Sequence, residues 1–248
     1  DRGMALYREF YQEQLKQNVV VFPLTAVDRQ ALGWFKRPVK DWNDLKGRKC
    51  RQTGVTAEVF AKSGMATVNL PGGEIVPSGQ RGVIECAEFV GAGVDIAIGF
   101  HTIWKNFYPQ STHEPATVVE LLINGDVWKS LSAPQQQAIR SAASETLLRW
   151  WVRWQKQNAD AIDEMRTKYG SQILRTPPEV LVAFLKAWDE MAKEESEKNA
   201  FFKKVLDSQR DYASKVVPAK RFMAPPYSFA ANYYWPEGKT PGKAEAKK

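Results

Sequence analysis

The sequence predicts an α/β fold with long helices in its second half. Through the first half of the 248 residues, short apolar runs typical of strands alternate with short helical segments. Helix-start signals at Ser132 and Thr176 then introduce long helical segments. The chain is 44% hydrophobic and 25% charged, as in an ordinary globular protein. No apolar run approaches the ~20 residues that a membrane-spanning helix needs.

The first half begins with a predicted helix over residues 4–18, where apolar side chains recur at helical spacing. Val19–Phe22 is a continuous apolar run, which is typical of a strand buried on both faces. A loop is expected over residues 25–34. The predicted elements that follow are a strand over 49–52, a helix over 55–63, a strand over 67–70, a turn or short helix over 74–82, and strands over 83–90 and 118–123.

Ser132 begins the longest predicted helix. Pro134 lies in its first turn and Gln135 follows the serine by three residues, which is a capping-box pattern. Because nothing interrupts the helical pattern, we expect a helix over 133–169. A strand over 172–174 and a second capping signal at Thr176 follow, and further helix extends to residue 214.

The composition divides the chain into an α/β part, residues 1–215, and a basic tail, residues 216–248. The tail has five prolines, which are expected to exclude regular helix, and six aromatic residues, too many for a disordered linker. From Val217 onward there are six basic and two acidic residues, so this segment carries more than half of the net charge of +7. The α/β part lacks the basic stripe that nucleic-acid binding needs, so no nucleic-acid partner is expected.

Cys50 and Cys86 are too few for a disulfide framework or a structural zinc site. Each cysteine lies in a predicted strand, so we expect two buried thiols. A single disulfide is the alternative in an oxidising compartment.

Polar residues near the predicted strand ends form the candidate site. Arg51 lies where a strand ends beside a helix N-terminus, the usual place for small anions in α/β proteins. Its guanidinium can bind a carboxylate with two parallel hydrogen bonds, although a surface position in the local basic run is the alternative. Gln30, Glu88 and Glu114 offer oxygen ligands for a hard cation. No nucleophile or acid–base set accompanies them, so a binding site without enzyme activity is expected.

Six segments, in this order, resemble the periplasmic solute receptors of tripartite ATP-independent periplasmic (TRAP) transporters, and most closely the subgroup that binds 2-oxo acids. They are Gln30–Phe35, Trp42–Arg51, Gly82–Gly91, Ile98–Phe100, Phe107–Pro109 and Trp128–Ser132. The likeness covers about residues 15–215.

The resemblance implies a two-lobed, periplasmic-binding-protein-like fold with long C-terminal helices that closes over a small carboxylate. It implies a receptor in the periplasm that delivers a 2-oxo-acid-like ligand to a TRAP permease in the inner membrane. Arg51 would bind the ligand carboxylate, and Phe89 would stand at a ligand-site tryptophan position. A Na⁺ or Ca²⁺ ion would bridge ligand and protein, held by Gln30, Glu88 and Glu114.

The sequence also departs from the family pattern. Family members carry an earlier segment that builds much of the first lobe, so the resemblance implies an N-terminally truncated chain with an incomplete first lobe. Three loops differ from the family near the expected site: Pro77–Gly82, Gly91–Asp95 and Gln110–His113. The alternative function is therefore a receptor-derived scaffold or accessory subunit, which would bind a larger protein assembly through these loops and residues 216–248.

Overall fold

The structure is a computed structural model that describes residues 2–236. The chain forms two compact units, Asp1–Ala192 and Lys193–Lys248. The predicted boundary between residues 215 and 216 marks a change of composition and stays a prediction. Residues 237–248 of the predicted tail lie outside the described residues.

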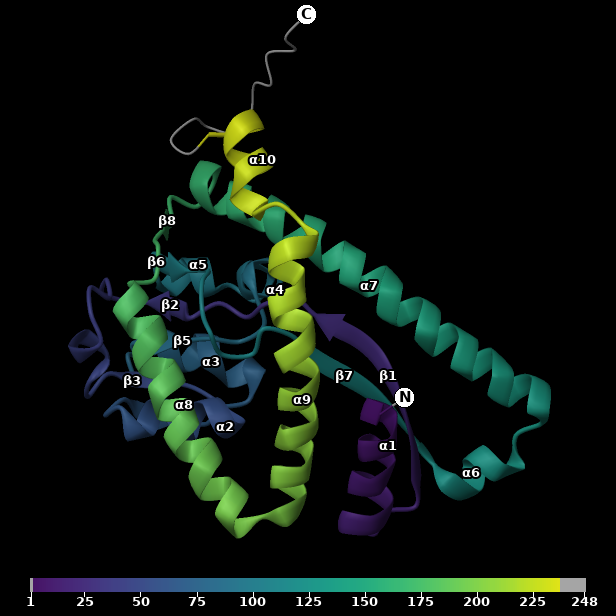
Figure 1. Cartoon of the computed structure of the whole chain (residues 1–248). Coiled ribbons are helices and arrows are strands. Elements are labelled where there is room, and N and C mark those ends of the chain that lie inside the picture. Colours follow the sequence, from purple (N-terminus) through teal and green to yellow (C-terminus); the bar gives the residue numbers. More distant parts are fainter. Residues whose placement is uncertain (1, 237–248) are drawn as a thin grey trace, which may run out of the picture. The chain divides into compact units, whose positions relative to one another are not determined.

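A two-stranded antiparallel ribbon pairs β1 (Val19–Val27) with β7 (Thr117–Asn124). Helix α1 (Arg2–Arg8) and a π-helical turn (Glu9–Gln14) precede it, in agreement with the predicted first helix. In Figure 1 the long helix α7 runs along the ribbon. The prediction of a strand buried on both faces is wrong, because within residues 2–236 β1 pairs with β7 alone and most of its side chains are half-buried.

A six-stranded sheet forms the centre of the first unit, in the order β4-β3-β5-β2-β6-β8. Strand β3 is parallel to β4 and β5, β2 is antiparallel to β5 and β6, and β8 is parallel to β6. The strands are β2 (Gly33–Phe35), β3 (Lys49–Arg51), β4 (Ala66–Val68), β5 (Cys86–Ala87), β6 (Asn106–Tyr108) and β8 (Gln172–Ile173).

Two of the predicted boundaries are corrected by this sheet. The expected loop over 25–34 is shorter, because β1 continues to Val27 and β2 begins at Gly33. The expected strand over 83–90 is reduced to Cys86–Ala87, because only these residues pair with both neighbours, β3 and β2. The predicted strand over 19–22 is found but extends five residues further, and the predicted strands over 49–52, 67–70, 118–123 and 172–174 are confirmed within two residues at each end.

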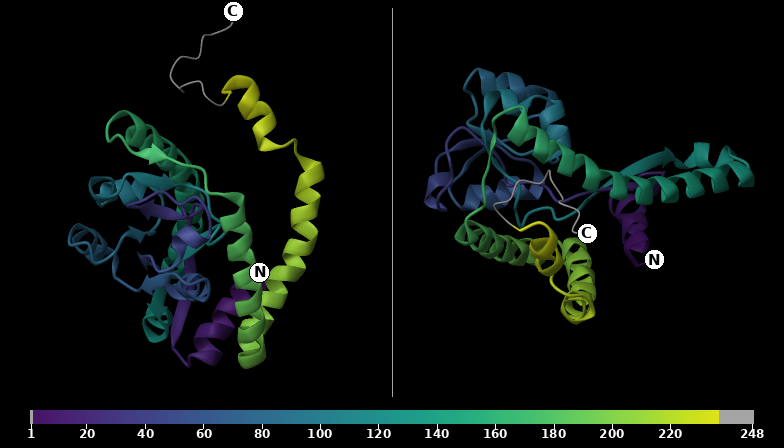
Figure 2. Two further views of the ribbon diagram at one scale, coloured as in Figure 1. Left: turned by 90° about the vertical axis from the view of Figure 1, so that its left-hand side faces the viewer. Right: turned by 90° about the horizontal axis from the view of Figure 1, so that it is seen from above.

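Helices cover both faces of the sheet (Figure 2). Trp34 and Phe35 are consecutive in β2, so their side chains point to opposite faces and enter two separate apolar clusters. Phe35 packs in one cluster with Phe60 and Phe184, and Trp34 packs in the other with Phe100 and Met165. The short helices are η2 (Asn43–Leu45), α2 (Gly54–Lys62), α3 (Gly72–Gln80), α4 (Ala92–Ala97), α5 (Phe100–Ile103) and α6 (Gly125–Ser130).

The long helices begin where the capping signals predict. Helix α7 spans Ala133–Thr167, and Ser132 and Gln135 form the complete capping box. Helix α8 spans Pro178–Lys198. Among the described residues, no helix is both long and apolar enough to cross a membrane.

The prediction that prolines exclude regular helix after residue 215 is wrong. Helix α9 (Ala200–Met223) contains Pro218, and α10 (Tyr227–Tyr234) begins directly after Pro226. A proline at a helix start costs little, because the first amides have no partner within the helix. Pro218 lies near the exposed C-terminal end of α9, where the loss of one hydrogen bond is tolerated.

The expectation of two buried thiols is also corrected. Both cysteines are buried, but they form a disulfide, Cys50–Cys86. The parallel register of β3 and β5 places them directly opposite each other, with their Cα atoms 4.6 Å apart. That separation lies within the range that a disulfide requires.

Candidate ligand-binding site

One edge of the sheet gathers the four polar residues predicted from the sequence. The parallel strands β3 and β5 both end there, so Arg51 and Glu88 meet. Strand β2 is antiparallel to them and begins at this edge, which places Gln30 just before it. Strand β6 is antiparallel to β2 and ends there, so Glu114 follows it. In α/β sheets, ligands bind outside the carboxyl ends of the strands.

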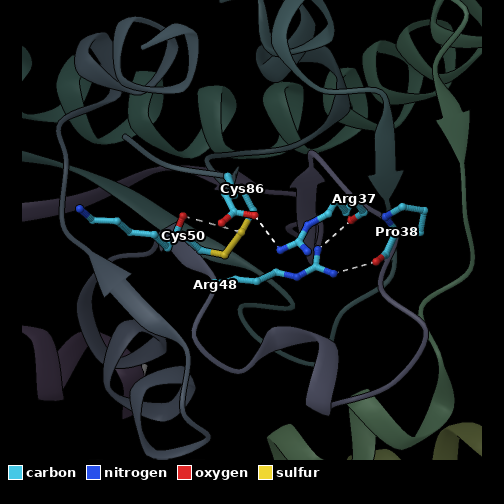
Figure 3. Close-up of a disulfide and its surroundings, with 7 residues drawn as sticks. Arg37, Pro38, Arg48, Cys50 and Cys86 are labelled. Carbon is cyan, nitrogen blue, oxygen red and sulfur yellow. Dashed lines mark hydrogen bonds and ion pairs between the residues drawn. A yellow bond between two sulfur atoms is a disulfide. The ribbon is translucent and has the colours of Figure 1, made fainter. Parts of the chain in front are cut away.

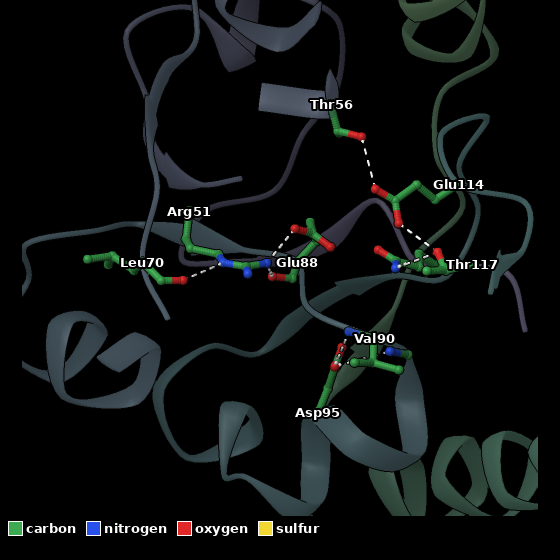
Figure 4. Close-up of polar contacts among 10 residues, drawn as sticks. Arg51, Thr56, Leu70, Glu88, Val90, Asp95, Glu114 and Thr117 are labelled. Atoms are coloured by element: carbon green, nitrogen blue, oxygen red, sulfur yellow. Dashed lines mark hydrogen bonds and ion pairs between the residues drawn. The ribbon is translucent and has the colours of Figure 1, made fainter. Parts of the chain in front are cut away.

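Arg51 is buried, with 6% of its surface exposed, so the alternative of a surface arginine is wrong. Its Nη1 donates to the carboxylate Oε1 of Glu88 at 2.6 Å and to the main-chain oxygen of Glu88 at 2.8 Å (Figure 4). Its Nε donates to the main-chain oxygen of Leu70 at 3.1 Å. The guanidinium carbon lies 5.4 Å from the ring centroid of Phe89. These contacts fix the guanidinium at the edge of the sheet.

Phe89 is half-buried beside this guanidinium, and Gly72 leaves room for its ring. A Cβ atom at Gly72 would lie 2.7 Å from the ring, so any larger residue at the start of α3 would displace it. The aromatic face therefore stacks against Arg51, where it can support the cation.

Glu88 is 2% exposed, and its Oε2 has no hydrogen-bond partner. The pKa of this carboxyl group is raised from 4.5 to about 8. Burial is the largest cause, the charge of Arg51 opposes the rise, and the charges of Glu114 and Asp95 add to it. A buried oxygen without a partner is costly, and a cation beside Oε2 would relieve that cost.

Two threonines hold Glu114, and one of them, Thr117, connects it to Gln30. Thr117 Oγ1 donates to Glu114 Oε2 at 2.8 Å and accepts a hydrogen bond from Gln30 Nε2 at 3.3 Å. Thr56 Oγ1, in the first turn of α2, donates to Glu114 Oε1 at 3.4 Å. With the Gln30 nitrogen bound to Thr117, the carbonyl oxygen is the part of the amide that can face a cation. Sequence reasoning missed both threonines, because a single hydroxyl carries no recognisable pattern.

Asp95 is a further buried carboxylate that sequence reasoning missed. Its Oδ1 accepts hydrogen bonds from the amides of Val90 and Gly91, both at 3.2 Å, and its Oδ2 accepts one from Trp34 Nε1 at 3.1 Å. Burial raises its pKa to about 6, and these hydrogen bonds oppose that shift. Asp95 thereby fixes the turn that follows Glu88 and Phe89.

The donor set fits a hard cation better than zinc. Carboxylate and amide oxygens are the ligands that Na⁺ and Ca²⁺ accept, and Ca²⁺ takes six to eight of them. Within residues 2–236, no group of three or more His, Cys, Asp and Glu side chains could hold a metal ion. A cation held by Gln30, Glu88 and Glu114 would therefore need further oxygens from a ligand or from water.

A match to a known protein family shows which family this chain belongs to. Residues 2–199 match the DctP family, described as bacterial extracellular solute-binding protein, family 7. This chain belongs to that family. The match confirms the resemblance to TRAP solute receptors that the sequence motifs indicate.

Known relatives of this family-7 protein include receptors for 2-oxo acids. The monocarboxylate 2-oxoacid-binding periplasmic protein all3028 of Nostoc sp. is 28% identical over 214 residues, which are 86% of this chain and 58% of that protein. A TRAP periplasmic solute-binding protein from Pseudoalteromonas atlantica, solved with sodium and pyruvate, is 29% identical with a TM-score of 0.82. The match covers 89% of this chain and 66% of that one.

A second receptor structure, from Colwellia psychrerythraea with calcium and pyruvate, is 27% identical with a TM-score of 0.83 and the same coverage. These likenesses confirm the predicted α/β fold of the periplasmic-binding-protein type with long helices. The chain spans less than two thirds of the length of each of these three relatives.

Proposed function

We propose that this family-7 protein is the solute receptor of a TRAP transporter and binds a small 2-oxo acid or related carboxylate together with a cation. The observation that carries the proposal is the meeting of Arg51, Glu88, Gln30 and Glu114 at one edge of the sheet. The relatives that bind pyruvate with sodium or calcium support the ligand class. The protein holds and releases its ligand without changing it.

Arg51 supplies the positive charge that a ligand carboxylate needs. Glu88 and Glu114 would repel that carboxylate, so a Na⁺ or Ca²⁺ ion between them and the ligand offsets the negative charge. Gln30, Glu88 and Glu114 would hold this ion. The unpartnered Oε2 of Glu88 supports this assignment, because the ion supplies the partner that the buried oxygen lacks.

The partner that receives the ligand would be a TRAP permease in the inner membrane, and the receptor would work in the periplasm. The extracellular character of the family supports this location. The Cys50–Cys86 disulfide supports it as well, because disulfides persist in oxidising compartments such as the periplasm. The predicted binding of another protein through residues 216–248 stays a prediction.

Isothermal titration calorimetry of the 248-residue chain tests the proposed function. Pyruvate and longer 2-oxo acids are titrated with calcium, with sodium and with a chelator, beside the corresponding 2-hydroxy acids. We expect binding of at least one carboxylate that weakens about tenfold or more without the cation. Absence of heat with every acid under every cation condition would refute the proposal.

A further inference from the structure

The disulfide Cys50–Cys86 joins β3, which ends at Arg51, to β5, which ends just before Glu88. Cys50 is bonded to Cys86 (Figure 3) and lies opposite it in the parallel register of β3 and β5. In the same register Arg51 lies opposite Ala87. Arg51 is the next residue after Cys50, and Glu88 is the second residue after Cys86. The disulfide therefore lies one residue before Arg51 in β3 and two residues before Glu88 in the segment that begins with β5.

Strand β5 pairs with β2 on its other side, and its direct main-chain pairing with β3 is short. It is two residues long, and beside it the amide of Glu85 donates to the main-chain oxygen of Lys49 at 2.8 Å. A slip of one residue in the register would turn the side chains of β5 to the opposite face of the sheet. A strand this short resists such a slip weakly, whereas a disulfide excludes it.

The contact that depends on this register is a buried ion pair. The side chains of Arg51 and Glu88 are 7% and 3% exposed, and their atoms approach to 2.6 Å. A buried pair offsets the cost of leaving water only when its geometry is good. Both cysteines are 1% exposed, so the bond is shielded from reductants in solution while the protein is folded.

We infer that the Cys50–Cys86 disulfide is a positioning element of the ligand site, which holds the Arg51 guanidinium against Glu88 by fixing the register of β3 and β5. The inference rests on the proposed function for its effect on ligand affinity. It assigns to the cysteines a role beyond general stabilisation, which a disulfide also provides by restricting the unfolded chain.

The test compares the double variant Cys50→Ala/Cys86→Ala with a matched control, Met191→Ala. Met191 is 2% exposed in the same apolar cluster as both cysteines, so its truncation destabilises the protein while leaving the disulfide intact. Both variants are measured below their unfolding transitions. We expect the pyruvate dissociation constant with calcium to rise about tenfold in the double variant and to stay near the wild-type value in the control.

Hydrogen exchange of the ligand-free protein gives a second readout that needs no ligand. The Glu85 amide should exchange about tenfold faster in the double variant than in Met191→Ala. Without the disulfide, the hydrogen bond from this amide to the main-chain oxygen of Lys49 opens more often. Equal Glu85 exchange in the two variants would overturn the inference, and so would unchanged pyruvate affinity in the double variant. If the wild-type chain binds no carboxylate, the proposed function fails, while the exchange of Glu85 still decides whether the disulfide fixes the register.

Discussion

Arg51 donates from a single guanidinium nitrogen to both the main-chain oxygen and the carboxylate of Glu88, at 2.8 and 2.6 Å. Arg51 is the last residue of β3 and Glu88 directly follows the neighbouring strand β5, so the two are 37 positions apart in the chain. Both side chains are buried, so when the Glu88 carboxyl is ionised each charge offsets the cost of burying the other.

Removing Arg51 alone should therefore destabilise the protein. Above pH 8, where the Glu88 carboxyl is ionised, Arg51→Ala leaves this carboxylate buried without its counter-charge, which typically costs about 3–5 kcal/mol of unfolding free energy, so the variants are compared in that range. The double variant Arg51→Met/Glu88→Leu removes both charges and should recover most of this loss. Urea unfolding measures all three proteins.

The exposed ion pair of Arg37 and Glu85 provides the control for that experiment. Its two atoms are 3.0 Å apart, but the side chains are 65% and 34% exposed. Arg37→Ala should cost less than about 1 kcal/mol, because water screens this pair. Equal losses for Arg51→Ala and Arg37→Ala would contradict the assignment of Arg51–Glu88 as a buried pair.

The stability of the cation-free protein should fall as the pH rises from 6.5 to 8. The pKa of Glu88 is raised from 4.5 to about 8, so the folded state keeps a proton that the unfolded state has lost. Stability from this group is therefore complete below pH 4.5 and is lost as the pH rises through 8. The pKa of Asp95 is raised only to about 6, so its contribution changes below this range.

The histidines oppose this trend only at lower pH. Burial lowers the pKa of His113 to about 4 and that of His101 below its ordinary value of 6.5. Both histidines therefore make the protein more stable as the pH rises toward 6.5, and they add no further change above pH 6.5. Glu88→Gln should therefore flatten the dependence between pH 6.5 and 8, measured by urea unfolding in a chelating buffer. A slope in Glu88→Gln as steep as in the wild type would show that another group titrates there.

Thr117 should be needed for cation affinity although it is not a predicted ligand. Thr117→Val removes the hydroxyl that joins Gln30 to Glu114, whereas Thr117→Ser keeps it. Loss of such a supporting hydrogen bond typically weakens metal binding by about 10–100-fold. Calcium titration followed by calorimetry, with and without pyruvate, should show this loss in Thr117→Val and not in Thr117→Ser.

A control for Thr117→Val is available in β4. Thr67→Val makes the same chemical change at a half-buried position of another strand and should leave calcium affinity unchanged. Equal affinities for the valine and serine variants at position 117 would contradict a positioning role for the hydroxyl.

Gly33 should tolerate no side chain. Its φ of +132° is rare for other residues, and a Cβ atom would lie 2.6 Å from the main-chain oxygen of Ala87 on β5. Gly33→Ala should cost about 1–3 kcal/mol for the backbone strain, and the collision adds to that cost. Gly47→Ala is the matched variant, because its φ is +68° but nothing lies within 4 Å of the added atom. Thermal unfolding that ranks Gly47→Ala as the more damaging change would refute this argument.

The sequence by itself determined the α/β class, most of the boundaries of the predicted helices and the residue types of the candidate site. Helix starts depend on local contacts. The side chain of Ser132 accepts a hydrogen bond from the Gln135 amide, and the side chain of Gln135 accepts one from the Ser132 amide, so this pattern can be recognised without the fold. The family motifs also identified Arg51, Glu88, Gln30 and Glu114 in advance, and the structure brings them to one edge of the sheet.

Only the tertiary structure decided how these residues are partnered. The burial of Arg51, the Cys50–Cys86 bond and the tie between Gln30 and Glu114 through Thr117 each join residues far apart in the chain. These contacts depend on strand order and register, which are set by the packing of whole strands and helices. A cysteine or a threonine has the same local pattern whether or not a partner lies opposite it, so the sequence left these contacts open.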